Sequence, residues 1–339
     1  MTAPGHLMQA EIAQAPAVFG HGITSAVSPA TARVLGDLAV GDCTAIYTIA
    51  RGSSDAAANI LSYEFMRELA RPMTSLPPSV FSLGAGVDLT GALALIISQS
   101  GASEDLVRAA TGARTKGARV VALVNQAGSR VADAAHVTLP IGAGPERAVP
   151  ATKSVIGAIA AGMALLGYLR PAYATRAARD AALIATLPAI THPRAPALLA
   201  ALLRAQHVYV IGRDTGFGAA HELALKLKET CALHAEAYSS SEVLHGPLQL
   251  VTKPLMVLIF DTGQPDVQDS LNTAEARFRA AGGDVHRIAP ADLGVTGLTP
   301  ATAAALILCM TYPLVLALAR ALGHDPDHPA TLSKVTQTR

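Results

Sequence analysis

The chain has 339 residues, of which 51% are hydrophobic and 15% are charged. This length suggests two domains, and the composition excludes an extended disordered protein. The 26 lysines and arginines and the 25 aspartates and glutamates give a net charge of +1. Because the basic residues are scattered without a run, we expect no nucleic-acid partner.

Two long apolar runs raise the question of a membrane protein. The run at 154–169 is too short to span a bilayer, and the run at 301–319 contains Pro313. We therefore predict that both runs are buried helices. The N-terminus lacks a basic stretch followed by an apolar core, so we expect no secretory signal, a cytoplasmic protein and no membrane partner.

The cysteines are odd in number, far apart in the sequence and surrounded by apolar residues. They are Cys43, Cys231 and Cys309. This pattern favours reduced thiols in the core over disulfides or metal ligation. We therefore expect no structural metal.

The remaining pattern alternates short apolar runs, Gly/Ser/Thr turns and helix-like stretches. In chain order we predict a helical lead-in at 1–40, strands at 44–50, 93–97 and 119–124, a connection at 171–204, strands at 207–212, 255–260 and 284–289, and a turn-rich tail at 323–339. Such alternation is typical of βαβ units around a buried parallel sheet.

Turns that follow or precede matching strands recur at a nearly constant distance along the chain. The pairs are Arg51 with Arg213, Gly101 with Gly263, and Gly117 with Gly283. The separation in sequence is identical in the first two pairs and only slightly longer in the third. Such a repeat predicts an α/β fold with two similar domains in tandem, at 41–170 and 205–322, each a parallel sheet flanked by helices.

The first candidate site is the polar loop at 98–103, which follows the strand at 93–97 and carries three hydroxyls and one amide. Loops at the carboxyl ends of parallel strands bind ligands, and helix N-termini offer free N–H groups to anions. The loop could therefore cradle a phosphate, with Ser53 and Ser54 in the same crevice. The alternative is that Ser103 simply caps the following helix.

The second candidate site begins on a predicted helix, where Glu222, Lys226 and Glu229 share one face. For such spacing alone, a solvated row of salt bridges is the favoured alternative. The segment that follows is less ordinary, since it concentrates further ionisable residues: His234, Glu236, Glu242 and His245. This density suggests acid–base chemistry more than metal binding, although His234 could be a hydrogen-bonded core residue.

Six motifs run through nearly the whole chain in a fixed order: SQSGAS, ATKS, ELALKLKE, HAEAY, EVLHGPLQL and LSKVTQT. Together they resemble the sugar-isomerase (SIS) domain family, which includes the isomerase half of glucosamine-6-phosphate synthases and deaminases of SIS type. The resemblance implies two SIS domains, each a mainly five-stranded parallel sheet flanked by helices. It also implies a homodimer with sites at the subunit interface.

The resemblance also implies roles for particular residues. The phosphate-binding positions are Ser98, Gln99, Ser100 and Ser103, and the neighbouring sugar- or phosphate-contacting positions are Ser53, Ser54 and Thr152. Two positions depart from the family pattern: Ala151 stands in place of a serine that contacts the sugar, and Ala102 in place of a glutamate in the phosphate loop. They bear on the details of the substrate and not on where the site lies.

Three further residues match catalytic positions of the family. Glu229 matches the carboxylate that moves a proton between C1 and C2 of the sugar. His245 matches the ring-opening histidine that the partner subunit contributes, and Lys334 matches a tail lysine that can form a Schiff base with an open-chain ketose. The tail that carries Lys334 is expected to fold over the substrate.

The synthases carry an N-terminal glutaminase, whereas here the SIS-like part begins almost at once after Met1. We therefore expect a deaminase that converts glucosamine 6-phosphate and water to fructose 6-phosphate and ammonia, without a cofactor. Glu229 would carry the C2 proton to C1, and water would hydrolyse the resulting imine. The alternatives are action on fructosamine 6-phosphate or galactosamine 6-phosphate, the same reaction driven backward with free ammonia, and a regulatory protein that senses a sugar phosphate.

Overall fold

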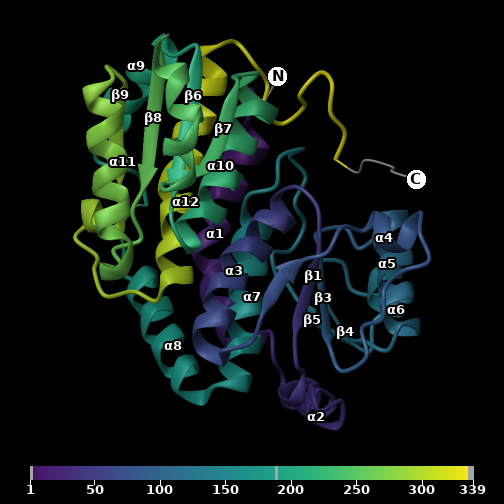
Figure 1. The fold of residues 1–339 in the computed structure, drawn as a ribbon. Helices are drawn as coiled ribbons and strands as arrows, with labels where there is room; N and C mark the ends of the chain where they lie inside the picture. The colour runs from purple at the N-terminus through teal and green to yellow at the C-terminus, as the bar shows by residue number, and fades with distance from the viewer. Residues whose placement is uncertain (1–2, 188–189, 253, 335–339) are drawn as a thin grey trace. The chain divides into compact units, whose positions relative to one another are not determined.

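The computed structural model describes residues 3–187, 190–252 and 254–334, and these form two compact units. We call Ala15–Glu146 with Lys153–Ala185 the first-sheet unit, and Met1–Gln14 with Arg147–Thr152 and Thr186–Lys334 the second-sheet unit. Each unit contains one of the two predicted sheets (Figure 1). The helix α1, His6–Ser25, begins in the second-sheet unit and continues in the first.

The first-sheet unit alternates strands and helices. Its remaining elements are α2 (Pro29–Asp37), the short helix η1 (Val40–Asp42), β1 (Ile46–Ile49), α3 (Ser53–Leu69), β2 (Met73–Ser75), α4 (Ser79–Ser82), β3 (Leu93–Ser98), α5 (Glu104–Thr115), β4 (Arg119–Val124), α6 (Arg130–Ala134), β5 (Val137–Pro140), α7 (Lys153–Leu169) and α8 (Pro171–Ala185). All five strands are parallel, in the order β2-β1-β3-β4-β5.

The second-sheet unit repeats this plan. Its elements are α9 (Ala195–Arg204), β6 (His207–Gly212), α10 (Thr215–Cys231), β7 (Ala235–Ser239), the short helices η2 (Glu242–His245) and η3 (Pro247–Thr252), β8 (Leu255–Phe260), η4 (Pro265–Val267), α11 (Gln268–Ala280), β9 (Asp284–Ile288), η5 (Pro290–Leu293) and α12 (Pro300–Ala321). The strands are again parallel, in the order β7-β6-β8-β9. The prediction of an α/β fold with two helix-flanked parallel sheets is confirmed.

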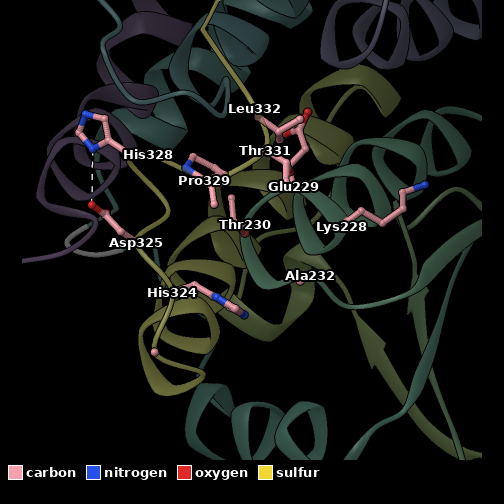
Figure 2. A pocket seen from close by; sticks show the side chains of 12 residues that line it. Lys228, Glu229, Thr230, Ala232, His324, Asp325, His328, Pro329, Thr331 and Leu332 are labelled. Carbon is pink, nitrogen blue, oxygen red and sulfur yellow. Dashed lines mark ion pairs between the residues drawn. The ribbon is translucent and has the colours of Figure 1, made fainter.

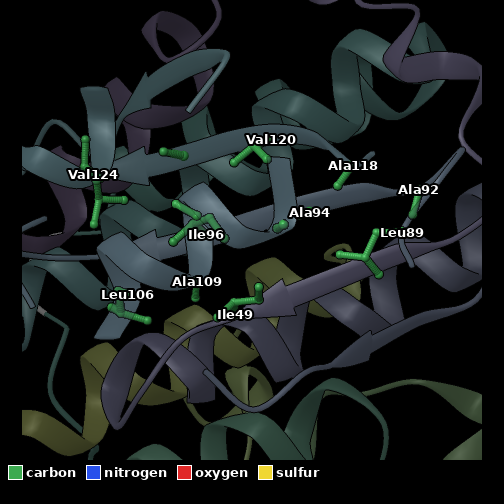
Figure 3. Close-up of a cluster of buried hydrophobic side chains, with 14 residues drawn as sticks. Ile49, Leu89, Ala92, Ala94, Ile96, Leu106, Ala109, Ala118, Val120 and Val124 are labelled. Carbon is green, nitrogen blue, oxygen red and sulfur yellow. The ribbon is translucent and has the colours of Figure 1, made fainter. Parts of the chain in front are cut away.

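The cores are built from central strands buried on both faces. Every residue of β3 and β8 is buried, which explains why both strands read as unbroken apolar runs. In the first sheet, α5 packs on β3 and β4 through small residues such as Ala109, which let the helix approach Ile96 and Val120 closely (Figure 3). Tight helix packing thus takes the place of a large aromatic core.

The repeat of the sequence also relates the backbones of the two units. The helices α3 and α10 both have 17 residues, and the separation of their first residues, Ser53 and Thr215, equals that of Arg51 and Arg213. Before each helix stands a residue with positive φ, 52° at Gly52 and 56° at Asp214. After each helix stands an alanine in the left-handed region. The two halves therefore share local geometry as well as topology.

The second sheet has four strands among the described residues, whereas the family resemblance implied mainly five. The stretch where a fifth strand would follow β9 is rich in turn-forming residues. Gly294 and Gly297 both adopt positive φ, and Pro290 and Pro300 start η5 and α12. Prolines and left-handed glycines interrupt an extended segment, so the chain passes directly into α12.

The long apolar helices and the cysteines lie in the interior, as predicted. Among the described helices, α12 alone is long and apolar enough to cross a membrane, and 89% of its most apolar stretch is buried within the protein. The helix continues through Pro313 without a break. Burial raises the pKa of the Cys231 thiol to about 11 and that of Cys309 to about 12, so both thiols stay protonated near neutral pH.

Candidate functional site

The first-sheet unit places its serine turns at one edge of the sheet. In this sheet β1 lies between β2 and β3, so the chain first runs from β1 to β2 on one side and then returns to β3 on the other side. The carboxyl ends of β1 and β3 therefore flank the point where the strand order reverses, a topological switch point. Ser53 and Ser54 start the helix that follows β1, and the loop 98–103 follows β3. Open α/β sheets bind ligands at such a point.

Internal hydrogen bonds shape the loop 98–103. The Ser98 hydroxyl accepts from the Gly101 N–H at 3.0 Å, and the Ser100 hydroxyl accepts from the Ala102 N–H at 3.3 Å. Gly101 has a φ of 60°, and a side chain there would collide with Ser129. The loop therefore needs glycine at this position to make its tight turn.

Ser103 stands at the N-cap of α5, but its side chain makes no capping hydrogen bond. Ser103 therefore takes the capping position that the alternative gave it, but its hydroxyl is not used as a cap. The N–H groups at the start of α5 thus donate no hydrogen bond to the Ser103 side chain, and they follow directly on the serine hydroxyls of the loop. This arrangement is suited to an anion.

Two acidic residues in the first turn of α5 would oppose an anion if they were not neutralised. Glu104 pairs with Arg130 at 2.6 Å and Arg108 at 3.2 Å, and hydrogen bonds from these guanidinium groups hold the pKa of Glu104 below its ordinary value. The fully buried Asp105 pairs with Arg51 from the loop after β1. The Arg51 pair also ties the two serine turns to each other, a link that sequence spacing could not reveal.

The second candidate site lies on α10 in the second-sheet unit. Glu222 and Lys226 are both fully buried, so the solvated row of salt bridges favoured by the spacing alone is wrong. The Lys226 ammonium pairs with Glu229 and lies 3.7 Å from Glu222 Oε1, which also accepts a hydrogen bond from Tyr312 at 3.2 Å. Helical periodicity identified the shared face but not which side of α10 meets α12.

Glu229 stands at the outer end of this buried network, with its side chain 25% exposed. Lys226 holds Oε2 of the carboxylate, and no hydrogen bond to Oε1 is present among the described residues. A carboxylate fixed through one oxygen can present the other to a substrate. The arrangement is suited to proton transfer at carbon, because the base keeps one orientation.

Glu229 lines a cavity of about 480 Å³ at the end of α10 (Figure 2). The opposite wall is formed by the tail, whose lining residues are Gly323, His324, Asp325, His328, Pro329, Ala330, Thr331 and Leu332. Lys334 follows soon after the lining ends and is half-buried. The tail therefore faces Glu229 across the cavity, while residues 335–339 of the predicted tail lie outside the described residues.

The tail is anchored to the start of α1. The buried Asp327 carboxylate accepts hydrogen bonds from the N–H groups of Leu7 at 2.9 Å and Met8 at 2.8 Å, and it pairs with His6 at 3.1 Å. Asp325 likewise accepts from the Gly5 N–H at 3.0 Å. A residue near the end of the described chain thus caps its first helix.

The other expected site residues are distributed over the two units. His245 ends η2 and is exposed, and Thr152 is fully buried in the segment Arg147–Thr152; both belong to the second-sheet unit with Glu229 and Lys334. The serine positions all belong to the first-sheet unit. Each unit therefore carries its own part of the expected chemistry.

Comparison with known proteins shows what this chain is similar to. The SIS domain family model matches residues 41–167 and 201–309. The glutamine–fructose-6-phosphate aminotransferase (isomerizing) of Aeropyrum pernix is 32% identical over 97% of this chain, which spans 57% of that relative. The chain thus spans a little more than half the length of the curated relatives it matches.

Solved structures show the same similarity. A protein from Silicibacter pomeroyi DSS-3, provisionally assigned as a phosphosugar isomerase, is 32% identical with a TM-score of 0.78, covering 94% of this chain and 99% of that one. Glucosamine-6-phosphate deaminase from Thermotoga maritima has a TM-score of 0.76 at 20% identity, covering 98% of this chain and 100% of that one. At 20% identity, this second likeness concerns the fold alone.

Proposed function

The chain belongs to the SIS domain family, and from this premise we propose that it is an enzyme of sugar-phosphate metabolism that deaminates glucosamine 6-phosphate. The products would be fructose 6-phosphate and ammonia, and the proposed location is the cytoplasm. One observation carries the proposal: the Glu229 carboxylate is fixed by the buried Lys226 in the wall of a cavity. Such a group is suited to moving a proton between adjacent carbons.

In the proposed reaction, His245 assists opening of the sugar ring. Glu229 takes the proton from C2 and returns it to C1, while the C1 oxygen gains a proton and the C2 nitrogen becomes an imine. Water then adds to C2 and ammonia leaves, so the atoms balance without a further reactant. The serine loop is assigned to the phosphate, and Lys226 is assigned the role of holding Glu229 in place.

We base the proposed direction of the reaction on what each direction consumes. Synthesis of the amino sugar needs a supply of ammonia, whereas deamination needs only water. The named aminotransferase relatives act on fructose 6-phosphate, which is the product in the direction that we propose. The cavity wall formed by the tail would limit access of bulk water to the intermediate.

The proposal is tested by measuring ammonia release from a panel of amino-sugar phosphates. We expect glucosamine 6-phosphate to give the highest kcat/KM and unphosphorylated glucosamine to give no measurable turnover. Preference for galactosamine 6-phosphate or a fructosamine 6-phosphate would move the assignment to another member of the same substrate class. Tight binding of a sugar phosphate without turnover would instead indicate a regulatory protein.

We also propose that two chains share each site, with His245 acting on the substrate held by a second copy. Glu229→Gln and His245→Ala proteins would each be inactive alone, but a mixed dimer would contain one intact site. After random exchange of subunits we expect about a quarter of wild-type turnover, because half the dimers are mixed and each has one working site. Verified exchange without recovery would contradict the shared site.

A further inference from the structure

An arginine links the loop after β6 to the segment that carries His245. Arg213 Nη1 donates to the Ser239 hydroxyl at 2.8 Å and to the Ser241 hydroxyl at 2.5 Å. Ser239 is the last residue of β7, and Ser241 directly precedes η2, which ends at His245. The guanidinium therefore holds the chain on the approach to a proposed catalytic histidine.

The repeat explains why Arg213 makes this contact. Its counterpart in the first unit, Arg51, pairs with the fully buried Asp105. At the same separation, the counterpart of Asp105 in the second unit is Val267, which offers no carboxylate. Arg213 is directed instead to two neutral hydroxyls, so the same arginine braces a different loop in the second unit.

Other contacts fix the segment on both sides of His245. The buried Ser240 hydroxyl lies 2.6 Å from the Ser270 hydroxyl, and the Tyr209 hydroxyl donates to the Pro247 carbonyl at 3.1 Å. His245 itself stays exposed between these fixed points. The loop is thus held against its own unit while the imidazole remains accessible.

We propose that Arg213 is a positioning residue for His245, acting through Ser239 and Ser241. The inference rests on the proposed function, since it concerns the ring-opening step assigned to His245. Groups that transfer protons must be held close to their productive geometry, and a displacement of about 1 Å can cost a rate factor of about 100. Loss of the guanidinium would allow the segment before η2 to move while Glu229 stays in place.

The test compares Arg213→Gln with Arg277→Gln, which changes an exposed arginine of α11 in the same unit. For cyclic glucosamine 6-phosphate, we expect Arg213→Gln to lower kcat about 10- to 100-fold and to change KM by less than about threefold. The control variant should match wild type.

A second readout isolates ring opening. The compound 5-deoxyfructose 6-phosphate lacks the hydroxyl that closes the ring, so exchange of its C1 hydrogen in D₂O requires Glu229 but no ring opening. We expect this exchange to stay within about twofold of wild type in Arg213→Gln and in His245→Ala. A defect of folding or of the whole site would slow both reactions equally.

The double variant Ser239→Ala/Ser241→Ala keeps Arg213 but removes its acceptors, and it should reproduce the selective loss. Unchanged kcat in Arg213→Gln, or equal loss of turnover and exchange, would overturn the positioning role while leaving the proposed function intact. A wild-type protein that neither releases ammonia nor exchanges the C1 hydrogen would overturn both.

Discussion

The helices α3 and α10 occupy equivalent places in the two units but carry opposite charge patterns. In α3, the fully buried Glu64 lies 3.7 Å from Arg67 and accepts a hydrogen bond from Tyr173 at 2.8 Å. At the equivalent positions of α10, the buried residue is Lys226 and its outer partner is Glu229. In each of these pairs the inner charge is buried and the outer one is more exposed, but the outer group is a guanidinium in α3 and a carboxylate in α10.

The loops after β3 and β8 also differ in charge between the two units. Gln99, in the uncharged loop of the first unit, is matched in the repeat by Asp261, which pairs with Arg287 at 3.0 Å. A carboxylate at that position would repel a phosphate. Under the proposed function, the first-sheet unit of this repeat would bind the anion and the second-sheet unit would transfer the proton.

The largest expected effect concerns Glu229 in the second-sheet unit. Glu229→Gln keeps the shape of the side chain but cannot accept the C2 proton, so kcat should fall about 10²- to 10⁴-fold with substrate binding nearly unchanged. Ammonia release and calorimetric titration with substrate would measure the two quantities. Asp269→Asn, an exposed acid-to-amide change on α11, is the control; wild-type turnover in Glu229→Gln would remove this residue from the mechanism.

The next effect tests what separates the two loops. Gln99→Asp gives the loop of the first-sheet unit the charge that Asp261 carries in the second-sheet unit, and repulsion of the phosphate should raise KM about 100-fold. Gln99→Asn, which shortens the side chain without adding charge, should cost much less. If both variants had equal KM values, charge would not be what distinguishes the loops.

A smaller effect is expected from single hydroxyls of the phosphate loop. Ser100→Ala and Ser103→Ala should each remove a hydrogen bond to a charged group, worth about 1.5 to 3 kcal/mol, and so raise KM for the phosphorylated substrate at least about tenfold. Thr262→Ala, the matching change in the second-sheet unit, should leave KM unchanged. Equal increases of KM in all three variants would contradict the assignment of phosphate binding to the first-sheet unit alone.

The smallest expected effect concerns the left-handed backbone geometry that follows α3 and α10 in the two units. Ala70 and Ala232 follow α3 and α10 with φ values of 52° and 50°, a region where glycine is unstrained. Ala70→Gly and Ala232→Gly should each raise the free energy of unfolding by about 0.5 to 1 kcal/mol, measured by urea denaturation. Opposite signs at the two sites would show that the shared geometry does not have the same energetic consequence.

The sequence predicted those features that depend on local pattern. Apolar runs identified the central strands, and turns such as Gly101 and Gly263 identified the repeat, because buried parallel strands and tight turns have distinctive compositions. The polar loop at 98–103 and the acidic segment with Glu229 stood out from their composition, and the family resemblance then implied their separate roles.

Features that depend on tertiary packing could not be predicted in the same way. The spacing of Glu222 and Lys226 favoured a solvated face, because periodicity does not say which face of a helix is covered. The pairing of Arg51 with Asp105 joins residues of two different loops, and no local pattern indicates such a contact. Neither does any local pattern link Arg213 to the segment before His245.

The capping of α1 by Asp327 has a consequence for the order of events on the ribosome. Asp327 is synthesised 319 residues after Met8, the residue whose N–H it accepts. The nascent chain must therefore carry a first helix without this cap, and a Glu229 cavity without its second wall, until residues 323–332 have been synthesised. Completion of the cavity is thus coupled to the synthesis of residues 323–332, so a chain that stops before them would lack the cavity wall that faces Glu229.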